Sequence, residues 1–194
     1  VADQTEGLCV IDISASDGLS NPRLIECLAT PGFTSGVTVS PDGQRLYIAD
    51  FGDGVHGYLI DDPLNPVLFA SADTDGSSYR VDVSGDGNQI FVADSTSIRA
   101  FDVDTNSLTP VADLSLEGTV YSVAVGIGGT TVYVASGNSG LQAVGFEKAT
   151  YTRGDQLPQE IVYEGDQSLS SSYSGTFSFR VSDGELLSNI ATVD

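Results

Sequence analysis

The 194-residue sequence contains no methionine or tryptophan, only two cysteines, one histidine and seven lysine and arginine residues. Seven scattered basic residues cannot form the cluster that binding to nucleic acid or to an anionic membrane surface requires. The sequence also lacks a run of about eighteen apolar residues, the length typical of a membrane-spanning helix. We therefore expect neither a nucleic-acid partner nor membrane insertion. Without methionine, the chain is expected to be processed or partial.

Acidic residues are abundant by contrast. Twenty-seven Asp and Glu give a formal net charge of −20 at pH 7. Such a surface is typical of a secreted or salt-adapted protein, because a net charge far from zero keeps a protein soluble. Since 40% of the residues are hydrophobic, the chain can still form a packed core. We expect a folded extracellular or cell-surface protein.

The sequence repeats itself with a period of 42 to 44 residues. Three segments align without gaps, namely Val37–Asp50, Val81–Asp94 and Val123–Ser136. Each period holds three or four short runs of β-branched and aromatic residues, separated by turn sequences such as Pro-Asp-Gly. Four strands in about 40 to 45 residues is the period of a propeller blade.

This pattern predicts an all-β fold, a partial β-propeller of four-stranded antiparallel blades. We expect residues 1–150 to form an orphan hairpin within residues 7–28 followed by about three blades. The strands of the first blade are predicted near 35–40, 45–50, 54–60 and 66–72, and the last blade lacks a clear fourth strand. A closed propeller has four to eight blades, so these repeats alone are not expected to close a ring.

Two stretches resemble known propeller repeats. Val39-Ser-Pro-Asp-Gly-Gln-Arg-Leu-Tyr-Ile-Ala-Asp50 resembles the YVTN-type repeat, and Gly7-Leu-Cys-Val-Ile-Asp-Ile13 followed by Asn21-Pro-Arg-Leu24 resembles the LVIVD repeat. The resemblance covers about residues 7–147. It implies a bacterial or archaeal, mostly extracellular propeller of the kind found in surface proteins, binding scaffolds and a few lactonase-like enzymes.

Residues 151–194 are expected to form a separate, short β segment, because the composition shifts after Lys148. Within it, the stretch 175–193 resembles the final hairpin of bacterial cadherin-like or immunoglobulin-like adhesin modules. The alternative is that Val181-Ser-Asp-Gly184 forms the turn of a further propeller blade.

The only histidine, His56, occupies the repeat position that holds Cys9, Arg99 and Gln142 in the other repeats. We interpret this position as a rim or solvent position, and we expect His56 to lack a carboxylate partner and to lie away from a central cavity. No other catalytic constellation is present. The sequence therefore predicts no catalytic and no cofactor-binding residues.

Two kinds of site remain. Asp50 with Asp53 and Asp73 with Asp75 lie at strand ends or turns, and oxygen ligands in loops suit Ca²⁺. These four are candidate calcium ligands, the alternative being turn formers on a solvated acidic surface. The two cysteines, Cys9 and Cys27, fall on opposite strands of the predicted hairpin. We predict a disulfide between them, the alternative being two buried free thiols.

The leading functional hypothesis is a non-catalytic extracellular or cell-surface module for binding or adhesion. Its partner would be a protein or carbohydrate surface, or neighbouring domains of a longer chain. The alternative is a lactonase-like propeller hydrolase with its site in the central channel. A single histidine favours the first hypothesis.

Overall fold

The structure is a computed structural model that describes residues 1–13, 22–146, 177–179 and 191–193. Within these ranges the chain forms β-strands, turns and one short 3-10 helix, Gly137–Ser139, but no α-helix. None of the described helical structure is long and apolar enough to cross a membrane. The predicted all-β architecture is confirmed.

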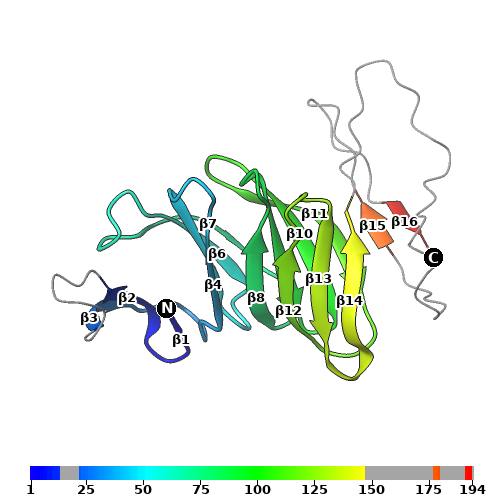
Figure 1. The fold of residues 1–194 in the computed structure, drawn as a ribbon, viewed down its shortest axis with the longest axis horizontal. Helices are drawn as coiled ribbons and strands as arrows, with labels where there is room; N and C mark the ends of the chain where they lie inside the picture. Colours follow the sequence, from blue (N-terminus) through cyan, green and yellow to red (C-terminus); the bar gives the residue numbers. More distant parts are fainter. Residues whose placement is uncertain (14–21, 147–176, 180–190, 194) are drawn as a thin grey trace, which may run out of the picture.

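Three antiparallel sheets follow the repeat (Figure 1). Blade 1 consists of β4 (Gly36–Val39), β5 (Arg45–Ala49), β6 (Val55–Leu59) and β7 (Val67–Ala72). Blade 2 consists of β8 (Ser78–Val83), β9 (Gln89–Asp94), β10 (Ser97–Val103) and β11 (Leu108–Ser115). Blade 3 consists of β12 (Val120–Val125), β13 (Thr131–Ser136) and β14 (Gly140–Gly145). Strands pair in chain order within each blade, as expected for propeller blades.

A fourth sheet precedes them. The expected hairpin consists of β2 (Gly7–Asp12) and β3 (Arg23–Leu28), and a further strand, β1 (Ala2–Asp3), pairs with β2. The sequence Val1-Ala-Asp3 matches Ile48-Ala-Asp50 at the end of β5. β1 is therefore the end of a second strand in the repeat, and we call β1 to β3 the hairpin blade.

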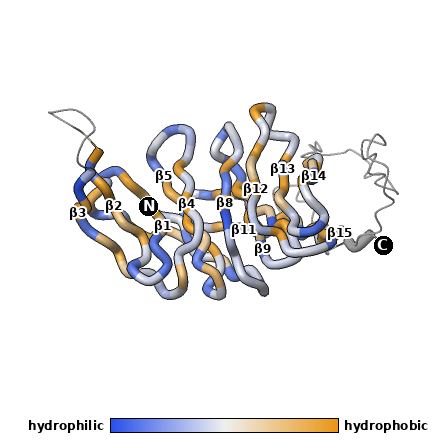
Figure 2. Tube along the Cα trace, turned by 60° about the horizontal axis from the view of Figure 1, so that its bottom comes forward, coloured by the Kyte–Doolittle hydropathy of each residue, from blue (hydrophilic) through white to orange (hydrophobic). Residues whose placement is uncertain are grey.

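The four sheets stand face to face and fan around a common edge (Figures 1 and 2). The first strands of the three blades, β4, β8 and β12, lie next to one another along that edge. The fan leaves two ends, one at the hairpin blade and one at blade 3. The described residues thus form part of a propeller ring.

Apolar layers fill the spaces between successive blades. Leu8 packs on Ile48 and Tyr58 between the hairpin blade and blade 1. The clusters around Tyr47 and around Phe91 fill the next two spaces. Blades 1 and 2 are covered by a neighbouring blade on both faces. Their strands are therefore continuous apolar runs, without the polar alternation of a strand that has one exposed face.

Two short strands lie apart from the ring in sequence. β15 (Phe177–Phe179) and β16 (Ala191–Val193) pair antiparallel, and β15 runs along the outer strand β11 of blade 2. The expected domain boundary near 150 and the turn at 181–184 lie outside the described residues. The resemblance of this segment to adhesin modules stays a prediction.

Candidate functional site

In the hairpin blade and in blades 1 and 2, one repeat position carries a link between the third and fourth strands of the repeat. The linked pairs are directly opposite in register and are, in chain order, Cys9–Cys27, His56–Ser71 and Arg99–Asp113. The first pair is a disulfide, the second a hydrogen bond of 2.7 Å between Nδ1 and Oγ, and the third an ion pair of 3.0 Å between Nη2 and Oδ2. Directly opposite side chains point to the same face of a sheet. We call this recurring contact the cross-strand link.

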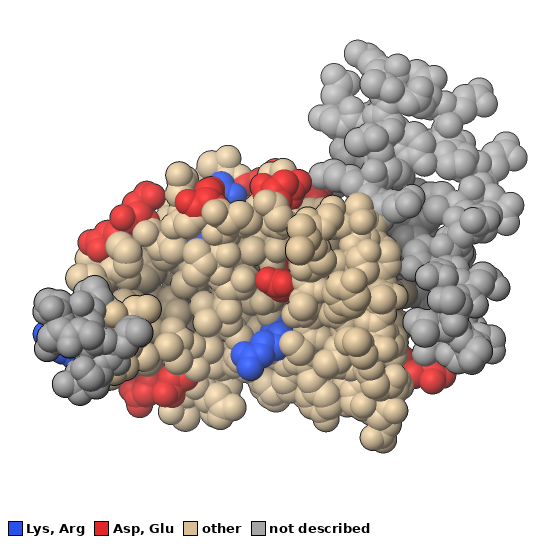
Figure 3. Space-filling model, in the orientation of Figure 1, with Lys and Arg blue, Asp and Glu red and all other residues tan. Residues whose placement is uncertain are grey.

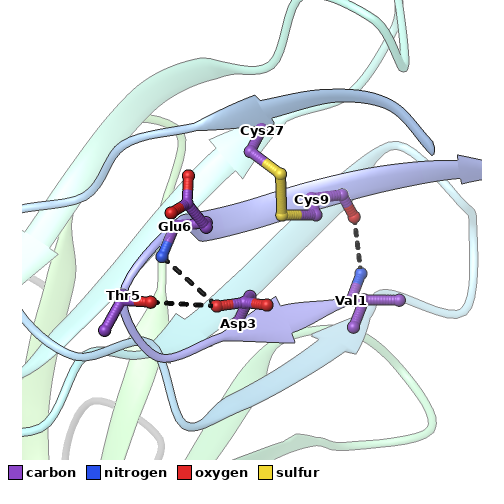
Figure 4. Close-up of a disulfide and its surroundings, with 6 residues drawn as sticks. All are labelled: Val1, Asp3, Thr5, Glu6, Cys9 and Cys27. Carbon is purple, nitrogen blue, oxygen red and sulfur yellow. Dashed lines mark hydrogen bonds between the residues drawn. A yellow bond between two sulfur atoms is a disulfide. The ribbon is translucent and has the colours of Figure 1, made fainter.

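The disulfide between Cys9 and Cys27 confirms the prediction made from their positions on opposite strands. Figure 4 shows it beside β1, where the amino group of Val1 donates a hydrogen bond of 2.7 Å to the carbonyl oxygen of Cys9. Asp3, the equivalent of Asp50, is exposed and accepts hydrogen bonds within its own turn from Thr5 and Glu6. The disulfide fixes the hairpin blade across its two longer strands.

A buried aspartate lies next to the cross-strand link of blade 1. Asp50 has no exposed surface, and its Oδ1 accepts hydrogen bonds from the hydroxyls of Thr30 at 2.9 Å and Thr34 at 2.8 Å. Its Oδ2 accepts the backbone N–H of Gly32 at 2.8 Å and lies 3.4 Å from Nε2 of His56. All three hydrogen-bond donors belong to the loop that crosses from β3 to β4. We call this arrangement the crossover latch, because it ties the incoming loop to blade 1.

Blade 2 contains a similar latch, in which Arg99 stands where blade 1 has His56. Asp94 is buried, accepts a hydrogen bond of 3.1 Å from the hydroxyl of Thr74 and lies 3.2 Å from Nε of Arg99. The same guanidinium contacts Asp75 at 2.7 Å and Asp113 at 3.0 Å. Burial raises the pKa of Asp94 above its usual value, although Thr74 and Arg99 oppose the shift. One cation therefore neutralises only part of the charge of three carboxylates.

In blade 3 the latch position holds Ser136, whose hydroxyl donates a hydrogen bond of 2.7 Å to the carbonyl oxygen of Glu117 in the incoming loop. Gln142 occupies the repeat position of His56 and is buried. Its Nε2 has no hydrogen-bond partner among the described residues. The incoming loop is thus still bonded to the end of the second strand, but here the strand residue donates the hydrogen bond, whereas Asp50 and Asp94 accept it.

The expectation for His56 is wrong. Its side chain is buried and contacts the carboxylate of Asp50, whereas we expected a rim position without such a partner. Cys9, His56 and Gln142 at this repeat position are all buried, and Arg99 is half-buried. Cys9, His56 and Arg99 each contact a different type of residue on the neighbouring strand, so the variation at this position does not indicate exposure to solvent.

The four candidate calcium ligands do not gather at one place. Asp50 is buried in the latch, Asp75 is paired with Arg99, and Asp53 and Asp73 are exposed. In the described part of the chain no three His, Cys, Asp or Glu residues are grouped so that they could hold a metal ion. Calcium binding stays a prediction.

The donors of the latch were not predicted from the sequence. Thr30 and Thr74 are one period apart, as are Gly32 and Gly76. A Cβ atom on Gly32 would lie 2.6 Å from Oδ2 of Asp53, and one on Gly76 would lie 2.6 Å from Oδ1 of Asp94. The repeated Thr-x-Gly in the crossing loop was the available signal.

Exposed aromatic rings line the same end of the blades. Phe51 follows Asp50 in a left-handed backbone conformation with φ of 54°, and its ring centroid lies 5.6 Å from that of Tyr79 on β8. Tyr79 in turn lies 5.7 Å from Tyr121 on β12. Phe51 and Tyr121 are exposed and Tyr79 is half-buried. These three rings, one from each blade, form what we call the aromatic row.

No protein-family model and no curated protein matches the chain. Among solved structures it is similar to a functionally unknown protein from Desulfotomaculum acetoxidans DSM 771, with a TM-score of 0.56 and 18% identity over 70% of this chain and 46% of that one. It is similar to a periplasmic gluconolactonase from Pseudomonas aeruginosa, with a TM-score of 0.55 and 22% identity over 63% and 38% of the two chains. A chain of the mitotic checkpoint complex gives a TM-score of 0.54 and 12% identity over 61% and 39%.

These likenesses concern the fold. They agree with the antiparallel blades and place the chain in the class of β-propeller proteins. The chain spans less than half the length of each of these three structures.

Proposed function

We propose that this propeller segment is a non-catalytic binding module of the cell exterior, with the aromatic row as its contact surface. The observation that carries the proposal is the recurrence of the cross-strand link. The single histidine occupies a position where the neighbouring blades hold a disulfide and an Arg–Asp ion pair. A position filled in these three ways serves to join strands.

Catalysis by His56 would need a free base within about 3 Å of a substrate proton. Asp50, His56 and Ser71 are residue types that hydrolases combine. Here, however, Asp50 already accepts three hydrogen bonds, and both Asp50 and His56 are buried. The arrangement therefore favours a structural role for this trio.

The aromatic row supports binding. Tyrosine is enriched at protein interfaces because it combines a large apolar face with a polar group. The rings of Phe51 and Tyr79 are inclined by 75° and those of Tyr79 and Tyr121 by 48°. Inclined rings leave gaps between them that side chains of a partner can fill. Sugars stack on flat aromatic surfaces, which this row does not provide, so we favour a protein partner over a carbohydrate. With a net charge of −20, the chain would steer a basic partner toward itself.

The disulfide supports an extracellular or periplasmic location. Disulfides form and persist in oxidising compartments such as the periplasm and the cell exterior. Cys9 and Cys27 are the only cysteines of the chain, and both are used in the bridge.

The test compares the wild type with the variant Phe51→Ser/Tyr79→Ser/Tyr121→Ser on a panel of immobilised extracellular-matrix proteins and glycans. A matched control, Leu64→Ser/Val67→Ser/Leu68→Ser, removes three exposed apolar side chains at the outer edge of blade 1. We expect the wild type and the control to bind at least one protein, and the aromatic-row variant to lose that binding. Absence of binding by the wild type, or equal binding by all three, would contradict the proposal.

One observation favours the lactonase-like alternative, namely the contact between His56 and Asp50. An assay for the hydrolysis of glucono-δ-lactone, monitored through the release of protons, decides between the binding module and the hydrolase. If the wild type hydrolyses the lactone and His56→Gln does not, while the melting temperature is unchanged, the protein is a hydrolase and the proposed binding function is wrong.

A further inference from the structure

The outermost strands β3, β7 and β11 differ in how their free edges are protected. An edge strand presents unpaired backbone N–H and C=O groups, and proteins usually block it with charged residues or proline, or cover it. β3 carries the exposed charged side chains of Arg23 and Glu26. The edge of β11 is covered by β15. In the described part of the chain, β7 has neither kind of protection.

The free edge of β7 is uncharged and partly apolar. Its sequence, Val67-Leu-Phe-Ala-Ser-Ala72, contains no charged residue and no proline. Val67 and Leu68 are 59% and 53% exposed. The strand pairs with β6 on one side, and no described strand pairs with its other side. β7 therefore offers an accessible edge to which another extended segment can be added.

Blade 2 shows how a strand is added at this edge of the repeat. A β-bulge lies in β11, where Val111 has no opposite residue on β10. β15, which comes from a distant part of the sequence, pairs antiparallel with the three residues after this bulge, Ala112–Leu114. A bulge in the outermost strand thus does not prevent the addition of a strand.

β7 has the same local geometry. Its bulge is at Phe69, which has no opposite residue on β6. The three residues after this bulge, 70–72, are equivalent to residues 112–114 of β11, because Ser71 and Asp113 both belong to the cross-strand link. An added strand is therefore expected to pair with residues 70–72.

Acidic residues lie at both ends of β7. Asp61 and Asp62 precede the strand and Asp73 follows it, and all three are exposed. The side chain of Asn65 and the backbone N–H of Leu64 donate hydrogen bonds to Asp62 and hold the pKa of its carboxyl below the usual value. Figure 3 shows acidic side chains along the upper edge of the blades, where the loop from β6 to β7 lies in Figure 1. Positive charges at the ends of an added strand would therefore favour its binding.

The same acidic residues disfavour pairing between two copies of the chain. If two β7 strands paired antiparallel, the beginning of each strand would lie beside the end of the other. Asp62 of one copy would then approach Asp73 of the other, and like charges opposite one another destabilise a sheet. The edge is better suited to a strand from a different protein.

We propose that the outer edge of blade 1 binds an extended segment of another protein by strand addition. The segment pairs antiparallel with residues 70–72, and it has an uncharged centre with lysine or arginine at both ends. In such complexes the main-chain hydrogen bonds supply affinity and the side chains supply specificity. This surface uses other residues than the aromatic row, so the proposal goes beyond the function proposed above.

Fluorescence anisotropy and hydrogen–deuterium exchange on the full chain test the proposal. The probe is a fluorescein-labelled synthetic peptide, Lys-Lys-Val-Thr-Val-Thr-Val-Lys-Lys, which we call the lysine peptide. We expect it to bind and to slow amide exchange in residues 67–72. Exchange in residues 112–114, which already pair with β15, is expected to stay unchanged.

Two control peptides separate strand addition from attraction between charges. One is the lysine peptide N-methylated throughout its central Val-Thr stretch, which removes backbone donors and keeps every charge. The other, the glutamate peptide, has Glu in place of each Lys. Each is expected to bind about tenfold more weakly than the lysine peptide, since one lacks the main-chain hydrogen bonds and the other is repelled by the acidic ends of β7.

Charge reversal on the protein tests the role of the acidic ends. Asp61→Lys/Asp73→Lys is expected to reverse the preference, so that the glutamate peptide binds more tightly than the lysine peptide. The matched control Glu6→Lys/Glu117→Lys makes the same change in net charge at exposed residues that do not belong to blade 1. It is expected to keep the preference of the wild type. Circular dichroism checks that both variants remain folded.

Variants described above distinguish this proposal from binding at the aromatic row. The variant that lacks the aromatic row is expected to bind the lysine peptide as the wild type does. Its control, which replaces Val67 and Leu68 on β7, is expected to bind the peptide more weakly. Failure of the wild type to bind the lysine peptide, equal binding of all three peptides, or protection outside β7 would overturn the proposal. So would a dimer of the wild type that protects residues 67–72 without peptide, since the edge would then bind a second copy.

Discussion

Replacing Arg99 by methionine should strongly destabilise the chain. Methionine keeps much of the side-chain volume but removes the cation that contacts Asp94, Asp75 and Asp113. Of the three carboxylates, Asp94 is buried and cannot recover its interactions from water. The variant therefore leaves a buried negative charge without its cation, beside two further negative charges.

Breaking a buried ion pair in this way costs about 3 to 5 kcal/mol. For a domain of this size, each kcal/mol lowers the melting temperature by roughly 2 to 4 °C, so we expect a decrease of roughly 6 to 20 °C. The assay is thermal and urea unfolding followed by circular dichroism. Arg23→Met is the matched control, because Arg23 is exposed and lies 3.6 Å from Asp12. Removal of such a surface ion pair costs about 1 kcal/mol or less.

The loss should also depend on pH. Burial raises the pKa of Asp94, so the folded state binds the proton more tightly than the unfolded state, and stability falls as the pH rises through the folded pKa. Loss of Arg99 enlarges this effect. The deficit of Arg99→Met should therefore shrink as the pH is lowered toward about 4, the ordinary pKa of Asp, and Asp94→Asn in the same chain should restore part of the stability at neutral pH. A deficit below about 1 kcal/mol, or one that grows in acid, would refute the reasoning.

Three further predictions concern the disulfide, the latch and the ions. Cys9→Ala/Cys27→Ala should lower the free energy of unfolding by about 3 kcal/mol, because the bridge closes a loop of sequence separation 18; alkylation of two thiols in the unreduced wild type would contradict it. Thr34→Val, which removes a hydroxyl donor from the buried Asp50, should cost about 2 kcal/mol while Thr34→Ser costs less, and equal effects would argue against the hydrogen bond. NaCl should raise the melting temperature by screening the charge of −20. Ca²⁺ should raise it further than Mg²⁺ at matched ionic strength if the native state holds a calcium site, and equal shifts would leave screening alone.

The period of the repeat was sufficient to predict the blades, because three segments kept the same spacing between apolar runs and turn residues. It was insufficient for β1, which offers only the three residues Val1-Ala-Asp3 for comparison. A strand of two residues forms here because β2 provides a paired edge, which is information from tertiary structure.

Of the three cross-strand links, the disulfide was predicted from the sequence, but the partners of His56 and Arg99 were not. The partners are 18 residues apart in the hairpin blade and 15 apart in blade 1. The register shifts between the third and fourth strands near the link in each case, after Val10, Gly57 and Ala100. A β-bulge adds a residue to one strand, so the residue opposite His56 cannot be found by counting equal numbers of residues outward from the turn. His56 consequently lacked a visible partner in sequence, and its variable repeat position suggested exposure.

The latch also defines the unit in which such a protein can be cut and recombined. Because Asp50 and Asp94 are held by threonines from the loop that arrives before β4 and β8, that loop belongs to the blade that follows it. A transplanted segment that starts at the first strand of a blade would leave its aspartate facing a foreign loop. One that starts at Thr30 and ends at Asp73 would bring its own donors and present the next loop, from Thr74, unchanged. For blade shuffling or circular permutation, we therefore expect junctions just before these threonines to be tolerated, and junctions between loop and aspartate to unfold the product.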